Sequence, residues 1–142
     1  MSFTNPPRQD IEDLLRRARV IAVVGLSDNP FRTSNGVAAA MQRHGYRMVP
    51  INPSVRSALG EPAFSSLASA TRALGAGTPI DIVNVFRRPE HVAGIVDECI
   101  ELCLPALWLQ EGVVDAAAAA RAQAAGMFVV MNRCIIKERT RI

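Results

Sequence analysis

The segment 20–24 constrains the fold more than any other part of the sequence. It reads Val-Ile-Ala-Val-Val, an unbroken apolar run rich in β-branched residues, and Gly25 follows it at once. A strand with one face in water alternates apolar and polar residues, whereas a strand covered on both faces does not. We therefore predict a strand inside a parallel sheet, with helices packed on both sides.

Strands and helices are predicted to alternate along the rest of the chain. The expected strands are residues 20–24, 46–51, 80–86, 106–109 and 127–131. The expected helices are residues 9–19 with Asp10 as cap, a helix capped by Ser34 or Asn35 that ends at Gly45, a loosely defined helix within 64–74, and residues 89–102, 114–125 and 134–139. Strand–helix–strand units of this kind make right-handed crossovers and parallel strands. The pattern predicts a single α/β domain, residues 1–142, with a Rossmann-like doubly wound sheet of about five parallel strands.

Composition narrows the classes of function. The 142 residues suffice for one hydrophobic core. No apolar run approaches the ~20 residues of a membrane span, and residues 1–10 lack a secretory signal, so we expect a cytoplasmic protein without a membrane partner. The net charge is +3, but the basic residues are spread along the chain without aromatic clusters, which argues against nucleic acid as a partner.

The three cysteines are expected to be free thiols, because their number is odd and no export signal is present. Cys99 and Cys103 lie four residues apart on an expected helix, a spacing that two metal ligands can use. No second ligand pair accompanies them, so we expect small buried side chains and no metal site.

Ligands of doubly wound folds bind at the carboxyl ends of the strands. The loop after the first strand is the expected anion site, because Gly25 allows close backbone approach and the next helix presents free amides. This loop does not match G-x-G-x-x-G, since the next glycine is Gly36. The missing motif argues against a typical dinucleotide site.

Arginines after several strands suit a phosphorylated ligand. An NAD site would have an acidic residue after the second strand, where this chain has Asn52 and Pro53 with Arg56 nearby. Arginine there suits the ribose phosphate of NADP or of coenzyme A (CoA), although a solvated surface residue explains Arg56 equally well. Arg32 can reach a pyrophosphate, and Arg87 or Arg88 can either clamp a ligand or merely cap the edge of the sheet.

No catalytic machinery is visible. Neither His44 nor His91 is placed by sequence beside a nucleophile, and Ser27 or Cys134 without a base is weak evidence for a triad. We therefore expect no catalytic residue and no enzymatic activity of the chain alone.

The chain resembles the small stand-alone CoA-binding domain proteins, which are similar to the N-terminal CoA-binding domain of the succinyl-CoA synthetase α subunit. The resemblance covers nearly the whole chain and depends on the order and spacing of several short runs. These runs include residues 23–30, 45–46, 49–53, 59–61, 81–83, 86–90, 108–112 and 133–134.

The resemblance also implies a role for particular residues. The residues expected to contact the pyrophosphate are Gly25, Ser27, Arg32 and Ser34. Those expected to contact the adenosine and its 3′-phosphate are Asn52, Pro53 and Arg56. Those expected to line an inner pocket are Phe86, Arg87 and Gln110. The synthetase subunit has a further domain with a phosphorylated histidine that has no counterpart in this sequence, so ligase activity is not implied. Asn132 departs from the acidic residue expected before Arg133.

The leading hypothesis is a non-catalytic module that binds CoA or an acyl-CoA as a carrier, sensor or partner subunit, with a protein partner possible. One alternative is an oxidoreductase-type domain that binds NADP. Another is an interaction protein whose nucleotide pocket is unused. A mixed disulfide between Cys134 and the CoA thiol is a further hypothesis.

Overall fold

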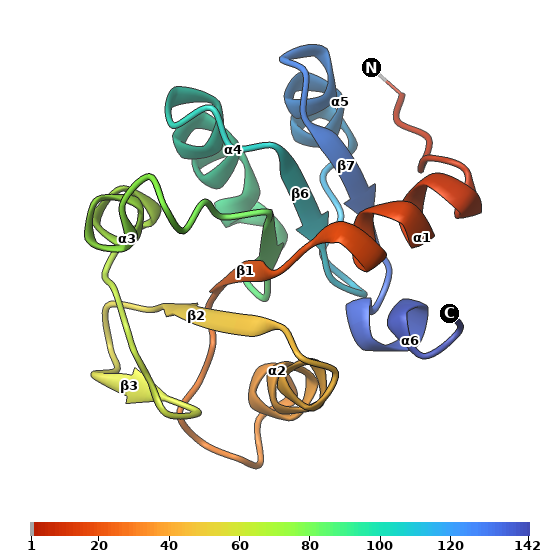
Figure 1. The fold of residues 1–142 in the computed structure, drawn as a ribbon. Coiled ribbons are helices and arrows are strands. Elements are labelled where there is room, and N and C mark those ends of the chain that lie inside the picture. The colour runs from red at the N-terminus through yellow and green to blue at the C-terminus, as the bar shows by residue number, and fades with distance from the viewer. Residues whose placement is uncertain (1) are drawn as a thin grey trace.

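A central parallel sheet organises the computed structural model, which describes residues 2–142. Its five strands lie in the order β2-β1-β5-β6-β7, and every neighbouring pair is parallel (Figure 1). The strands are β1 (Val20–Val24), β2 (Arg47–Ile51), β5 (Ile82–Val85), β6 (Ala106–Leu109) and β7 (Phe128–Met131). The predicted doubly wound α/β fold is confirmed.

Helices cover both faces of the sheet. They are α1 (Arg8–Arg17), α2 (Thr33–Arg43), α3 (Leu67–Leu74), α4 (Val92–Glu101), α5 (Ala116–Ala124) and α6 (Ile135–Arg139). One hydrophobic core joins α3, α4 and α5 to the sheet, and a second joins α1, α2 and α6 to the opposite face (Figure 1). Within β1, Ala22 belongs to the first core and Val23 to the second, so the strand is buried on both sides, as its apolar run predicts.

Three predicted helix starts need correction. The N-cap of α1 is Pro7, and Asp10 lies in the first turn. Helix α2 begins at Thr33, so Ser34 and Asn35 lie inside its first turn and neither is the cap. The segment that starts at Pro89 opens with a short 3₁₀ turn, η1 (Pro89–His91), before α4 begins.

A small hairpin between β2 and α3 was not predicted. It pairs β3 (Ser57–Ala58) with β4 (Glu61–Pro62) through a turn in which Leu59 and Gly60 have positive φ. Phe64 then makes a single parallel bridge to Ile51 at the edge of the sheet. These pairings are too short for any two-residue periodicity to reveal them.

Cys99 is buried as expected, but Cys103 lies beyond the end of α4 and is exposed, so the expected buried side chain on a helix is wrong there. Cys99, Cys103 and Cys134 are free thiols. Among residues 2–142, no helix has the length and apolar content needed to cross a bilayer.

The Cys99 thiol is expected to be unreactive in the folded protein. Burial, with a smaller contribution from the Glu98 charge, raises its pKa from 9.0 to about 12. Since the thiolate is the nucleophile, iodoacetamide at pH 8 should alkylate exposed Cys103 and spare Cys99 until the protein is unfolded. Peptide mapping by mass spectrometry measures this, and equal labelling of both thiols would contradict the burial of Cys99.

The same pKa shift predicts a pH dependence of stability. The unfolded thiol ionises near pH 9.0, whereas the folded thiol stays neutral until about pH 12. The contribution of Cys99 to the free energy of unfolding is therefore complete below pH 9 and is lost as the pH rises toward 12. In urea titrations, Cys99→Ala should fall less steeply in stability than the wild type over this range.

Candidate ligand-binding site

A crevice opens at the carboxyl edge of the sheet between β1 and β5. From β1 the chain continues through α2 on one face, and from β5 through α4 on the other. The two connecting loops therefore diverge, which makes this the topological switch point where doubly wound folds bind ligands.

Gly25 allows the loop after β1 to pass against the end of β5. Its φ is +91°, and a Cβ atom built there would lie 2.8 Å from the carbonyl oxygen of Phe86. Its amide donates to the carbonyl oxygen of Ile51 at 2.9 Å. Only glycine fits both this backbone conformation and the short contact.

Side chains from the first turn of α2 hold this loop in place. The Ser27 amide donates to Ser34 Oγ at 3.0 Å, and Asn35 Nδ2 donates to the Ser27 carbonyl oxygen at 2.9 Å. Both side chains are buried. No side chain caps the N-terminus of α2, because the cap position is Arg32, whose guanidinium cannot accept, and the amides of Thr33 and Ser34 stay available to an anion.

Three adjoining cavities form the crevice, and Phe86 lines all of them. We name them after one lining residue each: the Asn52 cavity of about 360 Å³, the Ser27 cavity of about 430 Å³ and the Gln110 cavity of about 440 Å³. Gly25 and Arg32 line both the Asn52 and Ser27 cavities. Arg87 and Arg88 line both the Asn52 and Gln110 cavities. The shared residues make one continuous cleft.

The arginines of the cleft give it a positive charge. Among residues 2–142, Arg32 and Arg87 make no ion pair, and Arg88 makes only a 3.7 Å contact with the exposed carboxylate of Glu90. No acidic residue lines the Asn52 or Ser27 cavity. Guanidinium groups without carboxylate partners favour a phosphorylated ligand at this end of the cleft.

The Gln110 cavity differs in character. Apolar side chains of Phe86, Pro89 and Val113 line it together with Gln110 and Cys134. Gln110 is 4% exposed, and its Oε1 accepts from Asn84 Nδ2 at 3.2 Å and from the Ile135 amide at 3.1 Å. This cavity is therefore less polar than the other two and suits a less polar part of a ligand, although Thr33, Arg87, Arg88 and Glu111 also line it.

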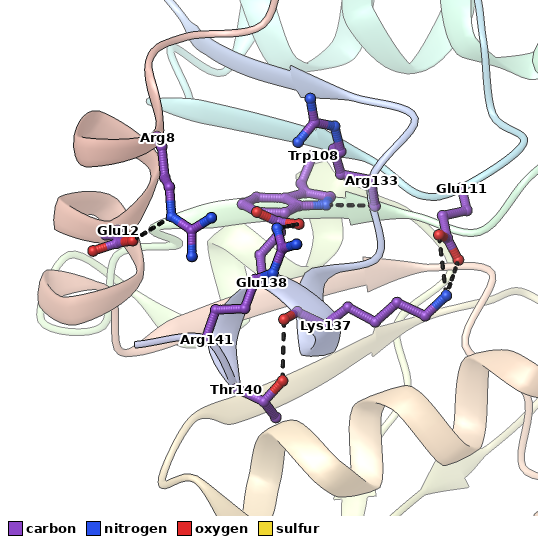
Figure 2. A network of polar contacts seen from close by, with 9 residues as sticks. All are labelled: Arg8, Glu12, Trp108, Glu111, Arg133, Lys137, Glu138, Thr140 and Arg141. Atoms are coloured by element: carbon purple, nitrogen blue, oxygen red, sulfur yellow. Dashed lines mark hydrogen bonds and ion pairs between the residues drawn. The ribbon is translucent and has the colours of Figure 1, made fainter.

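Contacts between neighbouring loops hold the wall of this cavity. Trp108 Nε1 donates to the Arg133 carbonyl oxygen at 2.9 Å, and Lys137 Nζ donates to Glu111 at 3.1 Å (Figure 2). Asn132 has a φ of 61°, and its Oδ1 accepts from the Gly112 amide at 2.8 Å. Asparagine tolerates this backbone conformation better than most residues, and its Oδ1 makes a contact that the carboxylate of the expected acidic residue would also make.

Nine of the ten predicted site residues line the three cavities. They are Gly25, Ser27, Arg32, Ser34, Asn52, Pro53, Phe86, Arg87 and Gln110. Arg56 does not line any of the three; it is exposed between β2 and β3. The structure thus brings the nine together, and their roles toward a ligand remain predictions.

The sequence reasoning missed several residues of the cleft. Thr33 lines the Ser27 and Gln110 cavities, and Ser54 lines the Asn52 cavity. Asn84 is fully buried beneath Gln110. A single asparagine inside an otherwise apolar strand was the available signal, because buried polar side chains need a partner.

The fold and cleft define the protein's class as a doubly wound α/β domain with a ligand crevice at the carboxyl edge of its sheet. Comparison with known sequences narrows this further. The sequence model of the family described as "CoA binding domain" matches residues 19–140, so the chain belongs to the CoA-binding domain family.

Individual proteins support the same relationship. "Uncharacterized protein YneT" of Bacillus subtilis (strain 168) is 44% identical over 131 residues, which cover 92% of this chain and 93% of that protein. The structure of "cell-free ID.343 from Thermus thermophilus" is similar with a TM-score of 0.87 and 30% identity, covering 96% of this chain and 98% of that one. A "hypothetical protein from Pyrococcus horikoshii OT3" is similar with a TM-score of 0.85 and 30% identity, covering 99% and 98%.

Gly25→Ala is expected to destabilise the protein by about 2 kcal/mol or more, from left-handed strain and displacement of the Phe86 carbonyl. Gly36→Ala is the matched control, because Gly36 lies in α2 with no atom near the added methyl group. The control should be stabilised by about 0.5–1 kcal/mol. Urea denaturation measures both; equal effects would contradict the close approach at Gly25.

Proposed function

We propose that this domain binds coenzyme A or an acyl-CoA in the cleft and acts as a non-catalytic module, as a carrier, a sensor or a subunit of a larger assembly. The observation that carries the proposal is the contrast between the polar, arginine-lined Asn52 and Ser27 cavities and the mostly apolar Gln110 cavity beside them. CoA has the same contrast, with a phosphorylated nucleotide at one end and a pantetheine arm at the other. Family membership supports the same ligand.

Each cavity then takes one part of the ligand. In the Ser27 cavity the pyrophosphate would meet the N-terminus of α2 and the side chains of Arg32 and Ser34. The adenosine would lie in the Asn52 cavity, whose Pro53 offers an apolar surface. The pantetheine arm would extend past Phe86 into the Gln110 cavity.

The side chain of Asn52, which lines the cavity proposed for the adenosine, has a fixed orientation. Asn52 is held in place, because Nδ2 donates to the Leu26 carbonyl oxygen at 3.0 Å and Oδ1 accepts from the Ser54 amide at 2.9 Å.

We assign Arg56 to the 3′-phosphate, which it would reach from the solvent-exposed side. The free thiols support a reducing compartment, and we propose the cytoplasm.

Isothermal titration with CoA, acetyl-CoA, NADP and ADP tests the proposed ligand. We expect micromolar binding of CoA or acetyl-CoA and far weaker binding of NADP, because the loop after β1 lacks the dinucleotide motif. A preference for NADP would favour an oxidoreductase-type domain. No heat from any of the four would favour an interaction protein whose pocket is unused.

Arg32→Ala and Arg87→Ala should each weaken CoA binding by about 10- to 150-fold, the loss of about 1.5–3 kcal/mol expected for a hydrogen bond to a charged group. Arg43→Ala is the matched control, because Arg43 is exposed in the last turn of α2, away from the cleft. Its dissociation constant should equal that of the wild type. An unchanged constant for either cleft variant would remove that arginine from the site.

A further inference from the structure

We propose that Gln110 donates a hydrogen bond to the thioester carbonyl of an acyl-CoA and thereby makes the domain selective for acyl thioesters. This inference rests on the proposed function and names its ligand more narrowly.

The orientation of the Gln110 carboxamide follows from its partners. A backbone amide can only donate, so the group that faces the Ile135 amide at 3.1 Å must be Oε1. Asn84 Nδ2 donates to the same oxygen at 3.2 Å. Two donors from different elements therefore hold Oε1 in place. The amide nitrogen Nε2 takes no part in these hydrogen bonds.

Nε2 is consequently the group that Gln110 can offer to a ligand. Nε2 makes no hydrogen bond to any of residues 2–142, although the side chain is 4% exposed and lines the Gln110 cavity. The side chains of Phe86, Pro89 and Val113 cannot accept, and the carboxylate of Glu111 pairs with Lys137. A free donor on an almost fully buried side chain, open to the cavity and with its partner oxygen held in place, favours a ligand that brings an acceptor.

The position of Gln110 indicates which part of the ligand it meets. Phe86, Arg87 and Arg88 belong both to the Gln110 cavity and to the arginine-lined Asn52 cavity, so they mark the end nearest the phosphates. Gln110 and Val113 line only the Gln110 cavity. A ligand whose phosphates lie at the arginines would thus reach Gln110 with the far end of its arm, where an acyl-CoA carries its thioester.

Asn84 acts as a positioning residue for Gln110. It is fully buried, its Nδ2 contacts the Trp108 carbonyl oxygen at 3.3 Å as well as Gln110, and its Oδ1 has no partner among residues 2–142. An unpaired buried oxygen costs stability. Holding the Gln110 carboxamide in one orientation is the functional gain that offsets this cost.

Calorimetric titration of three ligands with the full chain tests the proposal. The ligands are CoA, acetyl-CoA and S-ethyl-CoA, a thioether that differs from acetyl-CoA only in lacking the carbonyl oxygen. The wild type should bind acetyl-CoA about tenfold more tightly than S-ethyl-CoA, as expected for one hydrogen bond. In Gln110→Met this ratio should fall to about one, with little change for S-ethyl-CoA.

Two further variants separate positioning from folding. Gln110→Glu keeps an oxygen for Asn84 and Ile135 but replaces the Nε2 donor with an acceptor, so it should also lose the preference. Asn84→Leu removes the orienting hydrogen bond together with the unpaired oxygen. It should reduce the preference for acetyl-CoA while its melting temperature stays the same or rises, whereas a purely structural Asn84 would lower the melting temperature and leave the ratio unchanged.

The contrary outcomes are distinct. Equal wild-type affinities for acetyl-CoA and S-ethyl-CoA would overturn the assignment of Gln110 while CoA binding itself stands. Equal weakening of all three ligands in Gln110→Met would overturn it as well, because the donor would then serve a pantetheine amide. Failure of all three ligands to bind the wild type would reject the proposed function and this inference together.

Discussion

The close passage of the loop after β1 across the end of β5 is the contact on which the rest of the site depends. Gly25 makes it possible, because a Cβ atom there would lie 2.8 Å from the Phe86 carbonyl oxygen. The passage brings the N-terminus of α2 beside Phe86 and Arg87, so the three cavities join along Phe86. Without this approach, the arginine-lined and apolar parts of the cleft would be separate.

A second constraint is that the sheet is buried on both faces, which leaves the carboxyl edge as the place for a ligand. Each loop at this edge is tied to its neighbour: Ser34 holds the loop after β1, Asn52 joins the loops after β2 and β1, and Asn132 joins those after β7 and β6. Such bonds fix the loops before a ligand arrives, and preorganisation of this kind reduces the entropy cost of binding.

The sequence correctly predicted the features of the fold and site that local periodicity and composition determine. The limits of β1 and β6 match their apolar runs, and nine of ten candidate residues line the cleft because they follow strands that a parallel sheet brings to one edge. The predicted N-caps of α1 and α2 were wrong, because contacts made in the folded structure decide where a helix begins. Ser34 has a typical capping side chain, but α2 begins at Thr33 with Arg32 at the cap position, and Ser34 Oγ instead accepts from the Ser27 amide. Asn84 was missed because its partner Gln110, just beyond the end of β6, is distant in the sequence.

A crystal structure of the protein with bound CoA tests the central claim most directly. The account predicts the pyrophosphate at the N-terminus of α2 within reach of Arg32, and the pantetheine arm along Phe86 with its thiol end beside Gln110. CoA bound away from this edge of the sheet, or with its arm directed out of the Gln110 cavity into solvent, would contradict it.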